Sequence, residues 1–143
     1  MILADVNVLV YAFRRDTERH AEYRGWLWRV LREESAVGYA EPVLGSVVRI
    51  VTHPRIFAKP STVHAALGFC RVIRSRPNTV RVAPGDRHWS IFTDLCRSTN
   101  ARGNLVAEAY LAALAIKHGA VWMTADRHFA RYKGLRWRHP LDR

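Results

Sequence analysis

The sequence predicts an α/β fold, in which helices cover both faces of a central parallel sheet. Short apolar segments, typical of buried strands, alternate along the chain with longer segments whose apolar residues recur at helical spacing. No linker, repeat or low-complexity tract interrupts this alternation. Because strands that alternate with helices form parallel sheets with both faces covered, we expect an α/β/α sandwich and a single domain over residues 1–143.

The first third of the chain contains two of the predicted strands. Both are short apolar runs, and the segments between them carry apolar residues with helical periodicity. Proline is favoured in the first turn of a helix, so Pro42 indicates a helix start. The predicted elements are, in order, a strand over 2–4, helices over 6–13 and 18–34, a strand over 36–40, and a helix from Pro42 to Val51.

The remaining elements are marked by capping and stop signals. Ser61 and Asp86 are each expected to cap a helix, because their side-chain oxygens can accept a hydrogen bond from the first turn. In the helix after Asp86, we expect Trp89, Phe92 and Leu95 to face inward. The predicted elements are a helix after Ser61, a strand over 80–83, a helix after Asp86, a helix over 104–118, a strand over 120–124, a short helix near Phe129 and a strand over 135–137.

The charge of the chain predicts a polyanionic partner. There are 23 Lys and Arg residues against 12 Asp and Glu, a formal net charge of +11. Most of the basic residues are arginines, whose planar guanidinium suits bidentate contacts with phosphate. Nucleic acid or an acidic protein segment is therefore the expected partner.

Several other classes of protein are disfavoured. The two cysteines, Cys70 and Cys96, occupy apolar positions of predicted helices, and the seven histidines show no zinc-binding spacing. No apolar run approaches the roughly eighteen residues of a membrane span. Met1 leads directly into the first predicted strand, without the pattern of a targeting segment. We therefore expect a cytoplasmic protein with no membrane partner.

Four carboxylates are the candidate functional groups. Asp5 ends the first predicted strand, Glu41 follows the second and Asp126 follows the fourth, and ligands of open α/β sheets bind beyond these strand ends. Glu108 is the only charged residue between positions 105 and 116, and a lone buried carboxylate is costly without a cation or a donor. Converging carboxylates would repel one another, and a hard cation, Mg²⁺ or Mn²⁺, relieves that repulsion. The cluster therefore predicts metal-assisted phosphodiester hydrolysis.

Each carboxylate also has a purely structural interpretation. Asp5 and Asp126 can be N-caps of the helices that follow them, Glu41 can interact with a helix dipole, and Glu108 can be exposed. A phosphatase of the haloacid dehalogenase type also begins with an aspartate after the first strand. That chemistry needs a second aspartate two residues on, where this chain has Asn7.

The order and spacing of these residues resemble those of the PIN domain, specifically the VapC-type toxin ribonucleases. The resemblance covers nearly the whole chain. It is carried by residues 2–7 (ILADVN), 49–57 (RIVTHPRIF), 103–109 (GNLVAEA), 111–113 (LAA) and 124–126 (TAD), followed by Phe129 and residues 134–136 (GLR).

The resemblance implies a PIN-like α/β/α sandwich and endonucleolytic cleavage of RNA with Mg²⁺ or Mn²⁺. Asp5 would be the first metal carboxylate, Glu108 the third and Asp126 the fourth, and these three would be catalytic. Asn7 and Thr124 would orient ligands or water around them. The family also implies a cognate antitoxin protein that blocks the acidic pocket, and a homodimer or a toxin–antitoxin hetero-oligomer.

Two departures from the family pattern bear on this assignment. Glu108 stands where the family usually has the shorter aspartate. The family's second carboxylate usually lies inside the helix near Ser46, whereas here the nearest one is Glu41, which we assign as a metal ligand. Ser46 and Asn104, which lies one turn before Glu108, are expected to support the site. The alternative is a catalytically impaired PIN module that binds RNA or an antitoxin without cleavage.

Overall fold

The protein, described over residues 1–143 by a computed structural model, contains five short strands and six α-helices. A 3₁₀ helix, η1, lies between the last two strands. The elements are β1 (Ile2–Ala4), α1 (Val6–Phe13), α2 (His20–Glu33), β2 (Val37–Tyr39), α3 (Glu41–Val51), α4 (Val63–Ser75), β3 (Thr79–Arg81), α5 (His88–Thr99), α6 (Asn104–Lys117), β4 (Val121–Met123), η1 (Arg127–Arg131) and β5 (Trp137–Arg138).

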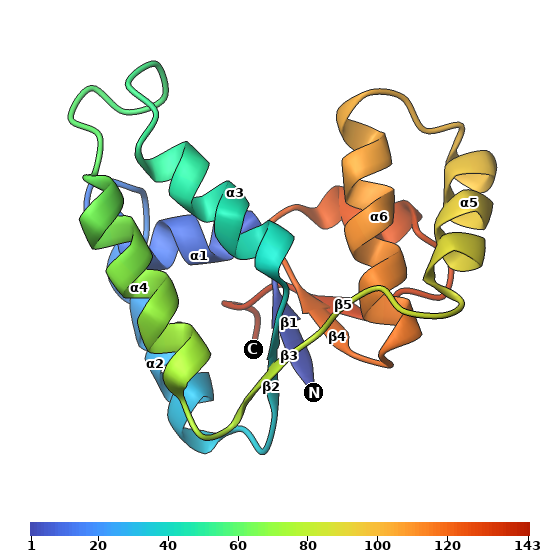
Figure 1. Ribbon diagram of the computed structural model, residues 1–143, viewed down its shortest axis with the longest axis horizontal. Coiled ribbons are helices and arrows are strands. Elements are labelled where there is room, and N and C mark those ends of the chain that lie inside the picture. The colour runs from blue at the N-terminus through green and yellow to red at the C-terminus, as the bar shows by residue number, and fades with distance from the viewer.

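All five strands are parallel, in the order β3-β2-β1-β4-β5. β1 lies at the centre, and Leu3 is in register with Gly38 on one side and Trp122 on the other. Figure 1 shows α1 to α4 on one side of the strands and α5 and α6 on the other side. The predicted α/β/α architecture with a parallel sheet is confirmed.

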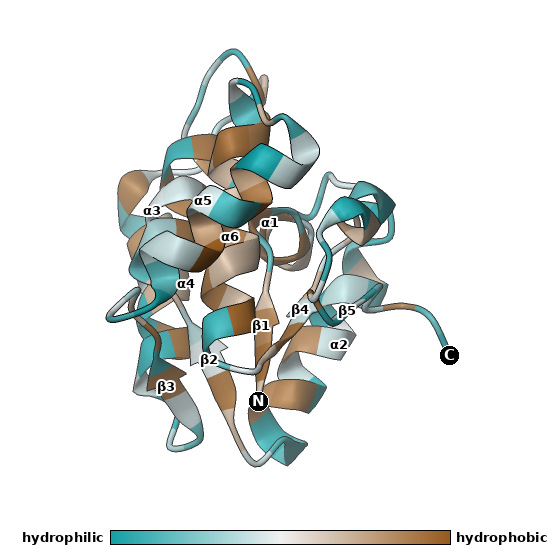
Figure 2. Ribbon diagram, turned by 90° about the vertical axis from the view of Figure 1, so that its right-hand side faces the viewer, coloured by the Kyte–Doolittle hydropathy of each residue, from teal (hydrophilic) through white to brown (hydrophobic).

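The core is built on the two central strands. Leu3 of β1 and Trp122 of β4 are almost completely buried, and 31 buried apolar residues form a single cluster, so both helical layers pack on one continuous core. Figure 2 shows hydrophobic residues concentrated on β1 and β4 and on the helices near them. No helix combines the length and the apolar character that crossing a membrane would require.

Two predicted helix caps are wrong. Thr62, not Ser61, caps α4, and its Oγ1 accepts a hydrogen bond from Ala65 N at 3.1 Å. Ser61 Oγ instead accepts a hydrogen bond from the guanidinium of Arg14 at 3.0 Å. Helix α5 begins after Arg87, which has a positive φ of 71° and makes no side-chain cap, so Asp86 does not cap it.

Trp89 was predicted to face inward, and this is also wrong. Leu95 is buried, but the Trp89 side chain is exposed, with 69% of its surface accessible. The inward position at the start of α5 belongs to His88, whose Nε2 lies 3.0 Å from the backbone oxygen of Tyr110. Successive residues of a helix are about 100° apart around its axis, so a buried His88 turns Trp89 outward.

Candidate active site

The strand order places the candidate site between β1 and β4. From β1 the chain proceeds to β2 and β3 toward one edge of the sheet, and then returns to add β4 on the other side of β1. The helix after β1 and the helix before β4 accordingly lie on opposite sides of the sheet. Such a reversal leaves a crevice at the carboxyl ends of the strands, where α/β proteins bind ligands. Asp5 directly follows β1 and Asp126 follows β4, so both lie at this crevice.

Asp5 is buried, with 7% of its surface exposed. It is the N-cap of α1, and its Oδ1 accepts a hydrogen bond from Val6 N at 2.7 Å. Its Oδ2 accepts a hydrogen bond from Thr124 Oγ1 at 2.6 Å. Burial, and to a smaller extent the negative charges of Glu108 and Asp126, raise the pKa of Asp5 to about 6 despite these bonds.

Thr124 connects Asp5 to the loop that follows β4. Its side chain is completely buried, and its hydroxyl donates to Asp5 and accepts from Asn7 Nδ2 at 3.4 Å and from Asp126 N at 3.0 Å. Asn7 Oδ1 in turn accepts a hydrogen bond from Ala125 N at 3.3 Å. The Thr124 hydroxyl thus uses its one donor and both of its acceptor positions. Asn7 and Thr124 therefore fix the two aspartates relative to each other.

Asp126 is the N-cap of η1, and its Oδ1 accepts a hydrogen bond from His128 N at 2.9 Å. The His128 ring lies beside the same oxygen, with Nδ1 at 3.1 Å, and is largely exposed. The structural interpretation of Asp5 and Asp126 as helix caps is thus correct, and it is compatible with a place in the site, because each carboxylate keeps unused acceptor capacity.

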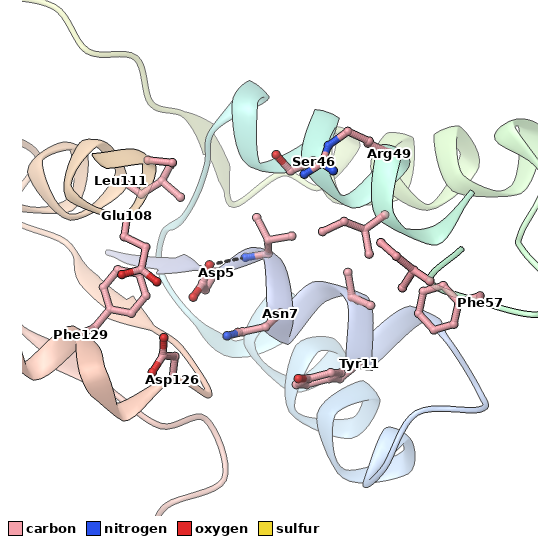
Figure 3. Close-up of a pocket in the computed structure, with 15 residues that line it drawn as sticks. Asp5, Asn7, Tyr11, Ser46, Arg49, Phe57, Glu108, Leu111, Asp126 and Phe129 are labelled. Carbon is pink, nitrogen blue, oxygen red and sulfur yellow. Dashed lines mark hydrogen bonds between the residues drawn. The ribbon is translucent and has the colours of Figure 1, made fainter. Parts of the chain in front are cut away.

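Glu108 is half-buried on α6, and it points from the opposite side toward the two aspartates (Figure 3). Its Oε2 accepts a hydrogen bond from the hydroxyl of Tyr132 at 3.2 Å. Burial raises the pKa of Tyr132, and the negative charge of Glu108 raises it further, so the phenol stays protonated and donates. Tyr132 was not among the predicted site residues, because only the fold brings it to α6.

Asp5, Glu108 and Asp126 line one pocket of about 460 Å³. Figure 3 shows these carboxylates gathered at one end, while Arg49 and Phe57 lie at the other. Five lining residues of α1 and α3 were missed as site residues, namely Val6, Val10, Tyr11, Arg49 and Ile50. Residues 7, 10 and 11 have the spacing of one helix face, which is the signal that predicts their common exposure to the pocket.

Three predicted site residues do not line this pocket: Thr124, which is buried and bonds to Asp5, and also Glu41 and Asn104. Glu41 forms an ion pair with Arg81 of β3, and about half of its side chain is exposed. It lies five residues before Ser46, which does line the pocket, and five residues correspond to about 140° around a helix, so Glu41 lies on a different face of α3. Its structural interpretation, an acidic residue in the first turn, describes it correctly. Asn104 is exposed at the start of α6 and is likewise outside the pocket lining.

The family follows from comparison with known proteins. A sequence model of the PIN domain matches residues 2–135. The chain belongs to the PIN-domain family. It is 44% identical to Ribonuclease VapC43 of Mycobacterium tuberculosis, over 99% of this chain and 97% of that protein, and 34% identical to Ribonuclease VapC25 of the same organism, over 98% and 99%.

Solved structures share the PIN fold. VapBC2 from Rickettsia felis, crystallised with a DNA fragment from its promoter, contains a chain that matches with a TM-score of 0.71 at 17% identity, covering 97% of this chain and 98% of that one. Mycobacterium tuberculosis VapC20, described as a sarcin-ricin loop cleaving toxin, matches with a TM-score of 0.64 at 17% identity, covering 91% and 93%. At this identity the likeness concerns the fold.

The donor set of this PIN domain fits a hard divalent cation. The pocket offers three carboxylates and no sulfur or imidazole ligand among its lining residues. No group of three or more His, Cys, Asp or Glu side chains is arranged to hold a metal ion by itself. Mg²⁺ usually keeps several waters and binds through one or two carboxylates together with substrate phosphate, so a closed protein cage is not required. Burial is the main cause that raises the pKa of Asp5, and the nearby charges of Glu108 and Asp126 add to it; a bound cation would oppose both effects by stabilising the ionised carboxylate.

Proposed function

We propose that this PIN domain, acting as one unit over residues 1–143, is a Mg²⁺- or Mn²⁺-dependent endoribonuclease and the toxin of a toxin–antitoxin pair. The observation that carries the proposal is the convergence of Asp5, Glu108 and Asp126 on one pocket in a chain with a net charge of +11. An acidic pocket in a basic protein suits a polyanion that is bound by its phosphates and hydrolysed at a metal. The relatives VapC43 and VapC25 are named as ribonucleases, which supports RNA cleavage as the reaction.

Asp5, Glu108 and Asp126 would hold the ion, and Glu41 is left out because it pairs with Arg81. A divalent ion bound there would supply Lewis acidity at the scissile phosphodiester. Thr124 keeps Asp5 Oδ2 in place through its 2.6 Å hydrogen bond. Asn7, which bonds to Thr124 and to Ala125 N, keeps the loop of Asp126 against β1. The chain therefore orients its carboxylates before substrate binds, which reduces the reorganisation needed during the reaction.

The other end of the pocket is suited to the RNA next to the scissile bond. Arg49 is a cation at this end, and its guanidinium can contact a neighbouring phosphate in bidentate geometry. Tyr11 and Phe57 line the same region, and aromatic rings can stack on an unpaired base. We assign phosphate binding to Arg49 and base contact to these two rings.

A test of the nuclease function uses the purified chain and a mixture of structured and single-stranded RNAs. We expect discrete cleavage with Mg²⁺ or Mn²⁺, loss of cleavage with EDTA, and recovery when the ion is added back. Cleavage that survives EDTA would contradict the metal mechanism. A chain that binds RNA but neither cleaves it nor binds Mn²⁺ would instead be the catalytically impaired module.

The toxin role extends the proposal to a partner protein and to the cytoplasm, where RNA is available. Several structural neighbours are described as VapBC assemblies, among them that of Rickettsia felis. We propose that an antitoxin segment with acidic character binds this basic surface in a hetero-oligomer and covers the pocket, and that the free chain is a homodimer. The protein encoded beside this chain should co-purify with it and inhibit cleavage. If it does neither, the toxin role fails and the nuclease function stands.

A further inference from the structure

We infer that Tyr132 is a positioning residue of the active site, which holds the longer carboxylate of Glu108 so that it can act where a shorter acid would otherwise be needed. The inference deepens the proposed function and rests on it. Tyr132 does not line the pocket and would not touch substrate or metal. Its effect would pass through the hydroxyl contact to Glu108 Oε2 at 3.2 Å.

The ring of Tyr132 is a rigid base for this contact. Tyr132 is 2% exposed, and its ring centroid lies 5.6 Å from that of Phe129, which in turn lies 5.6 Å from that of Trp122 in β4. Its backbone N donates to Phe129 O at 3.1 Å at the end of η1. A ring packed in the core on this side can aim its hydroxyl in only a narrow range of directions.

The hydroxyl has two acceptors and one proton. Tyr132 Oη lies 3.2 Å from Leu105 O and 3.2 Å from Glu108 Oε2. A hydrogen bond to an ionised carboxylate is about twice as strong as one between neutral groups, so the proton favours Glu108. One carboxylate oxygen of Glu108 is thereby held, and no hydrogen bond in the protein uses Oε1, which stays available to the pocket.

This contact also ties Glu108 to Asp126. Asp126 is the N-cap of η1 and Tyr132 is its C-cap, so one short element carries both residues. Glutamate has one more rotatable bond than aspartate, and fixing a long side chain costs conformational entropy. Holding Glu108 to the element that starts at Asp126 fixes its place relative to that second carboxylate. The geometry thus shows how the longer side chain of Glu108 is kept in one place at the pocket.

Tyr132→Phe is the direct test, because it removes the hydroxyl and keeps the ring in the core. Residues that hydrogen-bond to a metal ligand, without binding the metal themselves, typically contribute about 10–100-fold to metal affinity or activity. We expect a loss of this size in Mn²⁺ affinity, measured by titration without RNA, and in kcat, with the KM for RNA unchanged. Tyr110→Phe is the matched control, because Tyr110 lies on α6 and its hydroxyl makes no hydrogen bond in the protein. It should leave both quantities unchanged.

A double-mutant cycle separates positioning from a general effect on folding. In a Glu108→Asp background, the shorter carboxylate no longer reaches the hydroxyl, so adding Tyr132→Phe should cost nothing further. An equal loss in both backgrounds would overturn the inference, because Tyr132 would then act through the fold. Wild-type Mn²⁺ affinity and kcat in Tyr132→Phe would overturn it as well.

A metal-free measurement keeps this inference distinct from the proposed function. Tyr132→Phe should shift the ¹³C resonance of the Glu108 side-chain carboxyl in the protein without metal, and Tyr110→Phe should not. An unshifted resonance in Tyr132→Phe would show that the hydroxyl does not hold Glu108. A wild-type chain that neither binds Mn²⁺ nor cleaves RNA would contradict the proposed function. The resonance would still decide whether the Tyr132 hydroxyl holds Glu108.

Discussion

At the scale of single residues, Asp5 combines a structural and a chemical task. It caps α1 through Val6 N, and its other oxygen is held by Thr124 inside the candidate site. Asn can cap a helix as well as Asp, but it carries no charge. The substitution Asp5→Asn therefore separates the two tasks and is the sharpest single change in the pocket.

We expect Asp5→Asn to abolish RNA cleavage and to leave RNA binding nearly unchanged. The substitution removes a charged metal ligand and keeps the basic surface that contacts phosphates. Cleavage of a labelled RNA and a gel-shift assay on the same preparation measure the two effects. Asp94→Asn is the control, because Asp94 is an exposed acid on α5 that pairs only with Arg97. Cleavage by Asp5→Asn at the wild-type rate would remove Asp5 from the site.

The same substitution should stabilise the protein in a pH-dependent way. The pKa of Asp5 rises from 3.8 to about 6 on folding, so between these values the folded state holds a proton that the unfolded state has lost. Stability from this group therefore falls as pH rises through that window, and above it the ionised carboxylate costs roughly 3 kcal/mol. Without metal, Asp5→Asn should raise the free energy of unfolding at pH 7.5 by up to this amount and change it little below pH 4. Urea titrations at both pH values measure the difference, and an equal change at both would contradict this account.

At the scale of elements, the end of β4 organises the site. Thr124 is completely buried and bonds to two residues that lie more than one hundred positions earlier in the chain, Asp5 and Asn7. Because β4 lies beside β1, this one hydroxyl can order both the start of α1 and the loop before η1. The geometry of the candidate site thus depends on a side chain that does not line the pocket.

We expect Thr124→Val to lower cleavage about 10–100-fold, because it frees the carboxylate of Asp5 and leaves Asp126 N without its acceptor. The unpaired, part-buried N–H of Asp126 should also cost stability, at most about 1–3 kcal/mol. Thr93→Val is the control, since Thr93 donates only to Ser90 O within α5. Initial rates and thermal melts measure both effects. A variant as stable and active as the control would show that the Thr124 hydroxyl is dispensable.

The elements also show what the sequence could predict. The acids after β1 and β4 were predictable, because parallel strands end at one edge of the sheet, and Glu108 was predictable as a lone charge in an apolar helix. The direction of Glu41 depends on how α3 is rotated on its axis, and the position of a residue after a strand does not reveal that rotation. The Tyr132–Glu108 contact joins two elements 24 positions apart in the chain, so only their packing reveals it. Trp89 was misplaced because His88 took the inward position.

At the scale of the whole molecule, the net charge of +11 predicts how RNA binding responds to salt. Phosphate neutralisation by Arg and Lys releases counterions, so affinity falls linearly on logarithmic axes. For about six phosphate contacts with single-stranded RNA, the affinity should fall roughly 10²–10³-fold between 50 and 200 mM salt. The non-cleaving Asp5→Asn variant allows this measurement by fluorescence anisotropy with a labelled RNA. A flat response would show that the basic surface does not bind the phosphate backbone.

The strand order has a consequence for the timing of synthesis. β1 pairs with β4, so the site joins Asp5 to residues that are translated more than one hundred positions later, Glu108 and Asp126. At about 10 residues per second, roughly ten seconds pass between the translation of the first and the last of these acids. Under the proposed function, a nascent chain that has not reached Asp126 would lack a carboxylate of the pocket and would be unable to cleave RNA. The central strand is made first and the strand beside it that leads to Asp126 nearly last, so the proposed nuclease would gain a complete pocket only when almost all of the chain has been translated.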